Sequence, residues 1–411
     1  MRTVKSLFFN SSAQIIGKLV SGLGGIVVYG LIKRSLGDTG FGEFAIISAY
    51  VAFFYIAADF GFNAIVLREL KGHEATLKDS FRKLLGLRIV YSLALIFLAL
   101  AVMTFLPYNS EIKLAAIVLS LTILTQAIFT TTNLIFQFKL RYDLSTIATI
   151  VEAIVNVGLV YILATVGMNI VGVAGAYVAS GLAMVLVALG LVGRSVGTFS
   201  PSWDVKSWLT LSAATLPVGL TLMVNLVYFR ADTFIMSFYR SLAEVGIYGE
   251  AYKFFEYALV FPTFFMNAMY PILIRAYEED RARFLKLLRG AQLTLAGVGI
   301  GGALVGVVLA PVVIDLVYGP NSSADVLPLQ LLLAAAPVYF LSNLYMWLML
   351  LLRRQNAMAV AYFVGLVVNV TLNLIFIPHF SYIAAAITTG VSEAMILLLT
   401  FYLTRDYRDT R

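Results

Sequence analysis

The sequence lacks cysteine, has only two histidines, and is poor in charge: Asp, Glu, Lys and Arg make up 12% of its 411 residues. The absence of cysteine excludes disulfide bonds and thiolate chemistry. The two histidines lie far apart without paired carboxylates beside them, which argues against a metal site. The pattern G-x-x-x-x-G-K-[ST] is also missing, which excludes an ATP-driven pump for this chain alone. Because soluble proteins average about 25% charged residues, the low charge indicates that most of the chain lies in lipid.

Long apolar runs are abundant, with 61% hydrophobic residues and a mean hydropathy of +0.91. A helix that spans a membrane needs roughly 20 mostly apolar residues. The recurring runs predict an all-α, polytopic membrane protein of about twelve transmembrane helices, the first of them retained rather than cleaved as a signal peptide. These helices are expected at residues 11–32, 44–67, 88–106, 114–136, 146–166, 171–192, 210–238, 247–272, 291–310, 327–352, 357–377 and 383–403.

The lysines and arginines are distributed unevenly among the connections. With the N-terminus inside, the cytoplasmic segments hold 22 of them, Arg88 at the start of the third run included, and the outer segments hold 4. This bias predicts that both termini and the loop 193–207 lie in the cytoplasm. The net charge of +7 is therefore assigned to one face of the cytoplasmic membrane, and no nucleic acid is expected as a partner.

The chain contains a weak internal repeat. Asn63 recurs at an offset of 204 as Asn267, and Asn156 recurs at an offset of 213 as Asn369. Arg141 and Arg354 show the second offset as well. The repeat predicts an N-terminal six-helix bundle (1–192), a cytoplasmic linker (193–209) and a C-terminal six-helix bundle (210–411). Two six-helix halves run parallel, with the substrate path expected between them.

Three short motifs stand out: RSLGDTGFGEF at 34–44, Arg230-Ala231-Asp232 followed by VGIY at 245–248, and Tyr318-Gly319 followed by LPL at 327–329. With these motifs the chain resembles the multidrug/oligosaccharidyl-lipid/polysaccharide exporter superfamily, and within it the Wzx-type polysaccharide flippases. The resemblance implies two helix bundles around a central cavity that opens alternately to either side. It also implies a lipid-linked oligosaccharide and membrane lipids as partners, no cofactor and no enzymatic activity. Protons or sodium ions, and polysaccharide-assembly proteins, remain open as further partners.

Charged side chains at bilayer depth are costly and should face protein or water. Helical spacing places the polar residues on single faces of the first and second helices of each half, which line the cavity in the resembling family. The residues expected to bind substrate are Lys18, Arg230, Lys253, Gln14, Asn63, Asn225, Tyr252 and Asn267. The residues expected to couple transport to ions are Asp59, Asp232, Glu250 and Glu256, with Glu152 and Glu393 as weaker candidates.

The three cations Lys18, Arg230 and Lys253 suit a pyrophosphate group, since Arg binds phosphate through two parallel hydrogen bonds and Lys acts as a point charge. The alternative is that they only neutralise carboxylates. Asp59 is the expected partner of Lys18, and Asp232 that of Arg230.

Two functions compete with a flippase for polyprenyl-pyrophosphate-linked oligosaccharide. A proton- or sodium-coupled antiporter for small molecules, such as drugs, would favour a net acidic cavity. A membrane glycosyltransferase would favour large outer loops with acidic metal-binding pairs, and this sequence has short outer loops without D-x-D. The intramembrane cations favour the flippase.

Overall fold

The computed structural model describes residues 2–70, 74–320 and 322–405, without the side chains of 2–16, 217, 218, 220, 221 and 225. Within these ranges the chain is helical and contains no strand. It forms two compact units, Met1–Leu226 and Val227–Arg411. Helices dominate because a backbone in lipid must satisfy its N–H and C=O groups internally.

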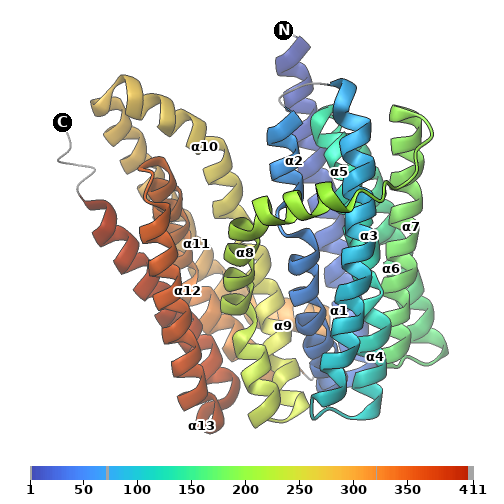
Figure 1. Ribbon diagram of the computed structural model, residues 1–411. Coiled ribbons are helices and arrows are strands. Elements are labelled where there is room, and N and C mark those ends of the chain that lie inside the picture. The colour runs from blue at the N-terminus through green and yellow to red at the C-terminus, as the bar shows by residue number, and fades with distance from the viewer. Residues whose placement is uncertain (1, 71–73, 321, 406–411) are drawn as a thin grey trace. The chain divides into compact units, whose positions relative to one another are not determined.

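The first unit is built from long helices that pack side by side (Figure 1). Helix α6 packs against both α1 and α7, and α3 packs against α5. Its helices are α1 (Arg2–Asp59), α2 (Phe62–Leu70), α3 (Glu74–Phe105), α4 (Ser110–Ser120), α5 (Thr122–Phe138), α6 (Tyr142–Val166), α7 (Ile170–Val196) and the first part of α8 (Val205–Tyr239).

The second unit is organised around α12, which contacts α9, α10, α11 and α13. A capping box begins α9, since Ser241 and Glu244 each bond the other's backbone amide. After the last part of α8, this unit contains α9 (Leu242–Ala258), α10 (Val260–Glu279), α11 (Arg281–Tyr318), a short 3-10 turn (Ser323–Asp325), α12 (Val326–Leu351) and α13 (Gln355–Thr404).

Nine stretches of the described residues are long and apolar enough to cross a membrane. Two of them, Gly17–Leu70 and Gln355–Thr404, contain a kink, at Gly37 and Ser381 respectively. The predicted all-α membrane architecture is confirmed, and the number of about twelve spans stays a prediction. Many helices are longer than the apolar runs predicted for them. The helical backbone hydrogen bonds continue into polar residues at the helix ends.

The turn before α6 and the turn before α13 have the same backbone geometry. Leu140 and Arg353 both adopt positive φ, 52° and 58°. In each turn the amide of the next residue, Arg141 or Arg354, donates to the carbonyl five positions earlier at 2.8 Å. Neither Leu nor Arg favours this left-handed conformation. Two such turns at an offset of 213 support the repeat inferred from the sequence.

A buried amide–hydroxyl pair occurs in both units. The Asn156 side chain donates to the hydroxyl oxygen of Ser180 at 3.2 Å, and the Asn369 side chain donates to that of Ser392 at 3.1 Å. At the other offset the environments differ: Asn63 is buried, whereas its sequence counterpart Asn267 is exposed. The repeat is thus closer in the second part of each unit than in the first.

The segment between α7 and α8 packs on the start of α3. Its Ser202 amide donates to the Arg82 carbonyl at 2.9 Å, and the Trp208 indole donates to the Lys83 carbonyl at 3.1 Å. These contacts group the start of α8 with the first unit, so the compact units divide within α8 rather than at 193–209. The division into two six-helix bundles with a linker stays a prediction.

Gly86 of α3 permits this packing, and replacing it is expected to disrupt it. A Cβ there would lie 2.1 Å from the backbone oxygen of Ser202. Gly86→Ala should therefore destabilise the protein by about 1–3 kcal/mol, as overpacking does, and lower the midpoint of thermal unfolding in detergent. Gly158→Ala is the matched control, because a Cβ at that helical glycine meets nothing within 4 Å. Equal midpoints for the two variants would refute the close contact.

Candidate functional site

Two cations of the second unit share one carboxylate. The Arg230 guanidinium, from α8, lies 2.7 Å from Glu256 of α9, and the Lys253 ammonium lies 3.1 Å from the other oxygen of the same carboxylate. The three side chains are 15–31% exposed. Two cations therefore contact one carboxylate in a partly buried cluster. Grouped cations of this kind suit an anionic group such as a phosphate.

Tyr252 forms part of the wall beside this cluster. Its ring lies under the Arg230 guanidinium, 5.9 Å from ring centroid to Cζ, and its hydroxyl donates to the Phe229 carbonyl at 3.3 Å. The cation–π contact and the ion pair together hold the guanidinium plane in place. The structure thus brings together Arg230, Lys253, Tyr252 and Glu256, four of the residues singled out in the sequence. Arg230 makes its direct ion pair with Glu256, whereas Asp232, the expected partner, interacts electrostatically with Arg230.

Asp232 lies deeper in the second unit, 2% exposed. Its carboxylate accepts hydrogen bonds from the Tyr248 hydroxyl and, at 2.7 Å, from the Thr233 amide. Hydrogen bonds of this type stabilise a buried carboxylate without a direct ion pair. The Tyr248 hydroxyl also lies 3.4 Å from the Thr389 hydroxyl, so Asp232 is connected to α13.

A second buried carboxylate, Glu393 of α13, lies in the same polar interior of the second unit. The Tyr228 hydroxyl of α8 donates to it at 2.7 Å and also lies 3.4 Å from the Ser392 hydroxyl. Ser392 in turn accepts from Asn369. The two carboxylates therefore belong to one region of tyrosine and hydroxyl contacts between α8, α9 and α13. Such a region can bind or release a small cation with little movement of the backbone.

In the first unit, the principal intramembrane ion pair joins Asp59 to Arg88. The Arg88 guanidinium donates to the Asp59 carboxylate at 2.9 Å and to the carbonyls of Asp59 and Ala127 at 3.2 Å. The Arg88 side chain is fully buried, and that of Asp59 is 44% exposed. Arg88 lies inside α3, which begins at Glu74, and is not at the start of the helix. Its assignment to a cytoplasmic segment stays a prediction. The expected Lys18–Asp59 pair is replaced by Arg88–Asp59.

The other predicted residues have diverse surroundings. Lys18 and Asn267 are exposed, and Glu250 is fully buried. Asn63 is buried and donates to the Thr130 carbonyl at 2.7 Å. Its amide thus stabilises the contact between α2 and α5. The side chains of Gln14 and Asn225 lie outside the described residues.

Two residues received too little weight from the sequence, Arg88 and Glu393. Arg88 interrupts the apolar stretch LLGLRIVYSLALIF, and this interruption was the available signal. Because positive residues commonly flank transmembrane segments, the same arginine also suits the start of a membrane span. Glu393 had the same signal, an acidic residue inside an apolar run, but its tyrosine partner is 165 positions away in the sequence. Such a distant contact has no local signature.

Comparison with known proteins agrees with this architecture. Residues 3–277 match the family described as polysaccharide biosynthesis protein. A probable flippase, AglR of Haloferax volcanii, is 27% identical over 171 residues, which cover 41% of this chain and 36% of the relative. The aligned part is thus well under two thirds of that relative's length.

Two solved structures share the fold. The lipid II flippase MurJ, in an inward closed conformation, aligns with a TM-score of 0.76 and 14% identity over 97% of this chain and 87% of its own. An inward-facing multidrug resistance MATE family transporter of the MOP superfamily aligns with a TM-score of 0.74 and 16% identity over 96% of both chains. These alignments confirm the fold expected from the sequence motifs. By its family match over two thirds of its length, the chain belongs to the polysaccharide biosynthesis protein family.

Proposed function

We propose that the chain is a flippase that moves a polyprenyl-pyrophosphate-linked oligosaccharide across the cytoplasmic membrane by alternating access. The observation that carries the proposal is the pair of cations, Arg230 and Lys253, on the single carboxylate of Glu256. A pyrophosphate would compensate the excess positive charge at a depth where charge is costly. The family match and the names of AglR and MurJ, both flippases, support the same conclusion.

Each predicted residue then has a role in the proposal. Arg230, Lys253 and Lys18 bind the anionic head, while Tyr252 presents a ring and a hydroxyl to sugars. Amide side chains add hydrogen bonds to the glycan: Gln14, Asn63, Asn225 and Asn267. Asp232, with Glu393 beside it in the polar interior, is the foremost candidate for coupling to protons or sodium ions. Asp59, Glu250 and Glu256 are further candidates.

A second function, an ion-coupled antiporter for small molecules, is favoured by one observation. Asp232 and Glu393 are two buried carboxylates held by tyrosines in a single unit, and organic cations bind well to acidic, aromatic surroundings. The fold shared with a multidrug transporter is compatible with it. The charge of the Arg230–Lys253–Glu256 cluster opposes it, because net positive charge repels such substrates.

Transport by purified protein in lipid vesicles distinguishes the two functions. We expect translocation of a fluorescent lipid-linked oligosaccharide and no accumulation of cationic dyes. Lys18→Gln and Arg230→Gln should each reduce translocation roughly 10- to 100-fold, since a hydrogen bond to a charged group contributes about 1.5–3 kcal/mol. Lys206→Gln, an exposed lysine near the start of α8, is the control and should transport normally. Dye transport without sugar-lipid transport would establish the antiporter instead.

A further inference from the structure

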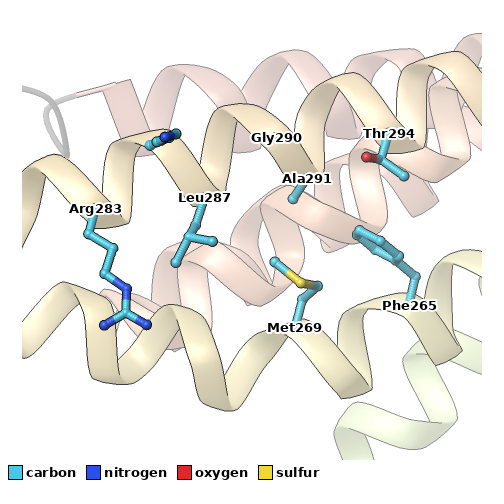
Figure 2. A pocket seen from close by; sticks show the side chains of 8 residues that line it. Phe265, Met269, Arg283, Leu287, Gly290, Ala291 and Thr294 are labelled. Atoms are coloured by element: carbon cyan, nitrogen blue, oxygen red, sulfur yellow. The ribbon is translucent and has the colours of Figure 1, made fainter.

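A groove of about 510 Å³ runs between α10 and α11 in the second unit. Figure 2 shows Arg283 at one end and Thr294 at the other, with Leu287, Met269 and Phe265 between them. Lys286, Gly290 and Ala291 complete the lining. The groove therefore combines two cations with an apolar floor. It shares no residue with the Arg230–Lys253–Glu256 cluster.

The two cations are placed where an anion would stabilise them. Arg283 and Lys286 are both exposed and lie in the first two turns of α11, which begins at Arg281. The positive end of a helix dipole disfavours cations and favours anions. The described residues give neither side chain an ion pair with a carboxylate. The Asp280 carboxylate already caps this N-terminus by accepting from the Arg283 amide at 3.1 Å. A phosphate beside Arg283 and Lys286 would therefore be stabilised mainly by the two side-chain charges.

The length of the groove suits a hydrocarbon chain. From Arg283 to Thr294 a helix rises about 16 Å at 1.5 Å per residue. One leaflet of a hydrocarbon core of about 30 Å is about 15 Å thick. Phe265 and Met269 of α10 face Leu287 and Ala291 of α11 along this path (Figure 2). An acyl chain that enters between the helices can therefore bury its length there while its phosphate stays beside the cations.

We propose that this groove binds an anionic phospholipid of the surrounding membrane, with its phosphate on Arg283 and Lys286 and one acyl chain along the apolar floor. Both cations belong to a basic segment that the charge bias assigns to the cytoplasmic side, where anionic lipids attract Lys and Arg. The site is distinct from the proposed transport path and does not depend on the substrate. A bound lipid would fix the angle between α10 and α11.

The test measures binding of fluorescent phosphatidylglycerol to full-length protein in phosphatidylcholine nanodiscs. Arg283→Gln/Lys286→Gln should weaken binding about 30-fold, since each of the two basic residues near an anionic surface contributes about 1 kcal/mol. Arg289→Gln is the matched control, because Arg289 is exposed on the same helix but does not line the groove. Arg289→Gln should leave binding nearly unchanged. A loss of affinity per removed charge as large in Arg289→Gln as in the double variant would show general surface attraction and would overturn the site.

A second variant isolates the acyl chain. Gly290 lines the groove, and a Cβ there meets nothing within 4 Å. Gly290→Leu should therefore fold normally, fill the groove and weaken phosphatidylglycerol binding at least fivefold while both cations remain. Unchanged binding in Gly290→Leu would mean that only the head group is recognised, which contradicts the proposed groove. Glycerol phosphate, which has no acyl chain, should not compete with the lipid in the wild-type protein.

Discussion

Asp59→Ala should reduce the free energy of unfolding by about 3 kcal/mol, because removing one partner of a buried ion pair leaves the other charge uncompensated. The charge left behind belongs to Arg88, whose side chain is fully buried in α3. Two backbone carbonyls still accept from its guanidinium, but they carry no net charge. We therefore expect Asp59→Ala to lower the midpoint of thermal unfolding in detergent and to yield less folded protein.

Removal of the other partner, Arg88, should lower the free energy of unfolding by less than Asp59→Ala does. Arg88→Met removes the buried charge and keeps most of the side-chain volume, while Asp59, 44% exposed, can be hydrated. We expect a loss of about 1–2 kcal/mol, the range for an unsatisfied buried polar group. Asp59→Ala/Arg88→Met should be no less stable than Arg88→Met alone. This non-additivity is the signature of a direct pair.

An exposed pair provides the control for this cycle. Arg141 donates to both oxygens of Asp143 at 2.8–2.9 Å, and the Arg141 side chain is 55% exposed. Asp143→Ala should cost less than about 1 kcal/mol, as for surface ion pairs. If Asp59→Ala is as mild as Asp143→Ala, the guanidinium of Arg88 is compensated by something other than Asp59, and the buried pair is not the determinant of stability.

The sequence predicts the helical content of this molecule well and its charge pairing poorly, for physical reasons. A 20-residue apolar run has few alternatives to a transmembrane helix, so the helices could be located without tertiary information. The turns at Leu140 and Arg353 were signalled only indirectly, through the repeated arginines that follow them. The boundary of the third helix was placed too late because Arg88 was read as a membrane flank.

Which carboxylate a cation contacts depends on how each helix is rotated and tilted against its neighbours. The sequence does not determine these angles. Lys253 and Glu256 are three positions apart on one helix, so their contact could be expected. The contact of Arg230 with Glu256 crosses from α8 to α9, and the nearer acid in sequence, Asp232, is instead bonded by Tyr248. Helix periodicity indicated that Arg230, Lys253, Tyr252 and Glu256 lie on polar helix faces, and the structure brings these four side chains together. The periodicity could not show which carboxylate each cation contacts.

Glu256→Gln should destabilise the second unit by about 3 kcal/mol and make it responsive to pyrophosphate. The substitution removes the charge of the carboxylate that contacts both Arg230 and Lys253, as in a broken buried pair. An anion that binds the folded state restores stability by RT ln(1 + [L]/Kd), or about 2.7 kcal/mol at 100 times Kd. Pyrophosphate should thus raise the unfolding midpoint of Glu256→Gln more than that of the wild-type protein, in which Glu256 competes for the cations.

This comparison separates the two interpretations of the cations. If they only neutralise Glu256, the site has no room or geometry for phosphate, and pyrophosphate should leave the variant as unstable as before. Glu244→Gln is the control, since Glu244 also pairs with an arginine, Arg240, at 2.6 Å in the same unit, but with no lysine beside it. Arg230→Gln alone should respond no more than the wild-type protein, because Lys253 still contacts Glu256. In Glu256→Gln/Arg230→Gln only Lys253 of the two cations remains, so the pyrophosphate response should be smaller than in Glu256→Gln. An undiminished response would place the anion elsewhere and remove the main support for a pyrophosphate-binding cluster.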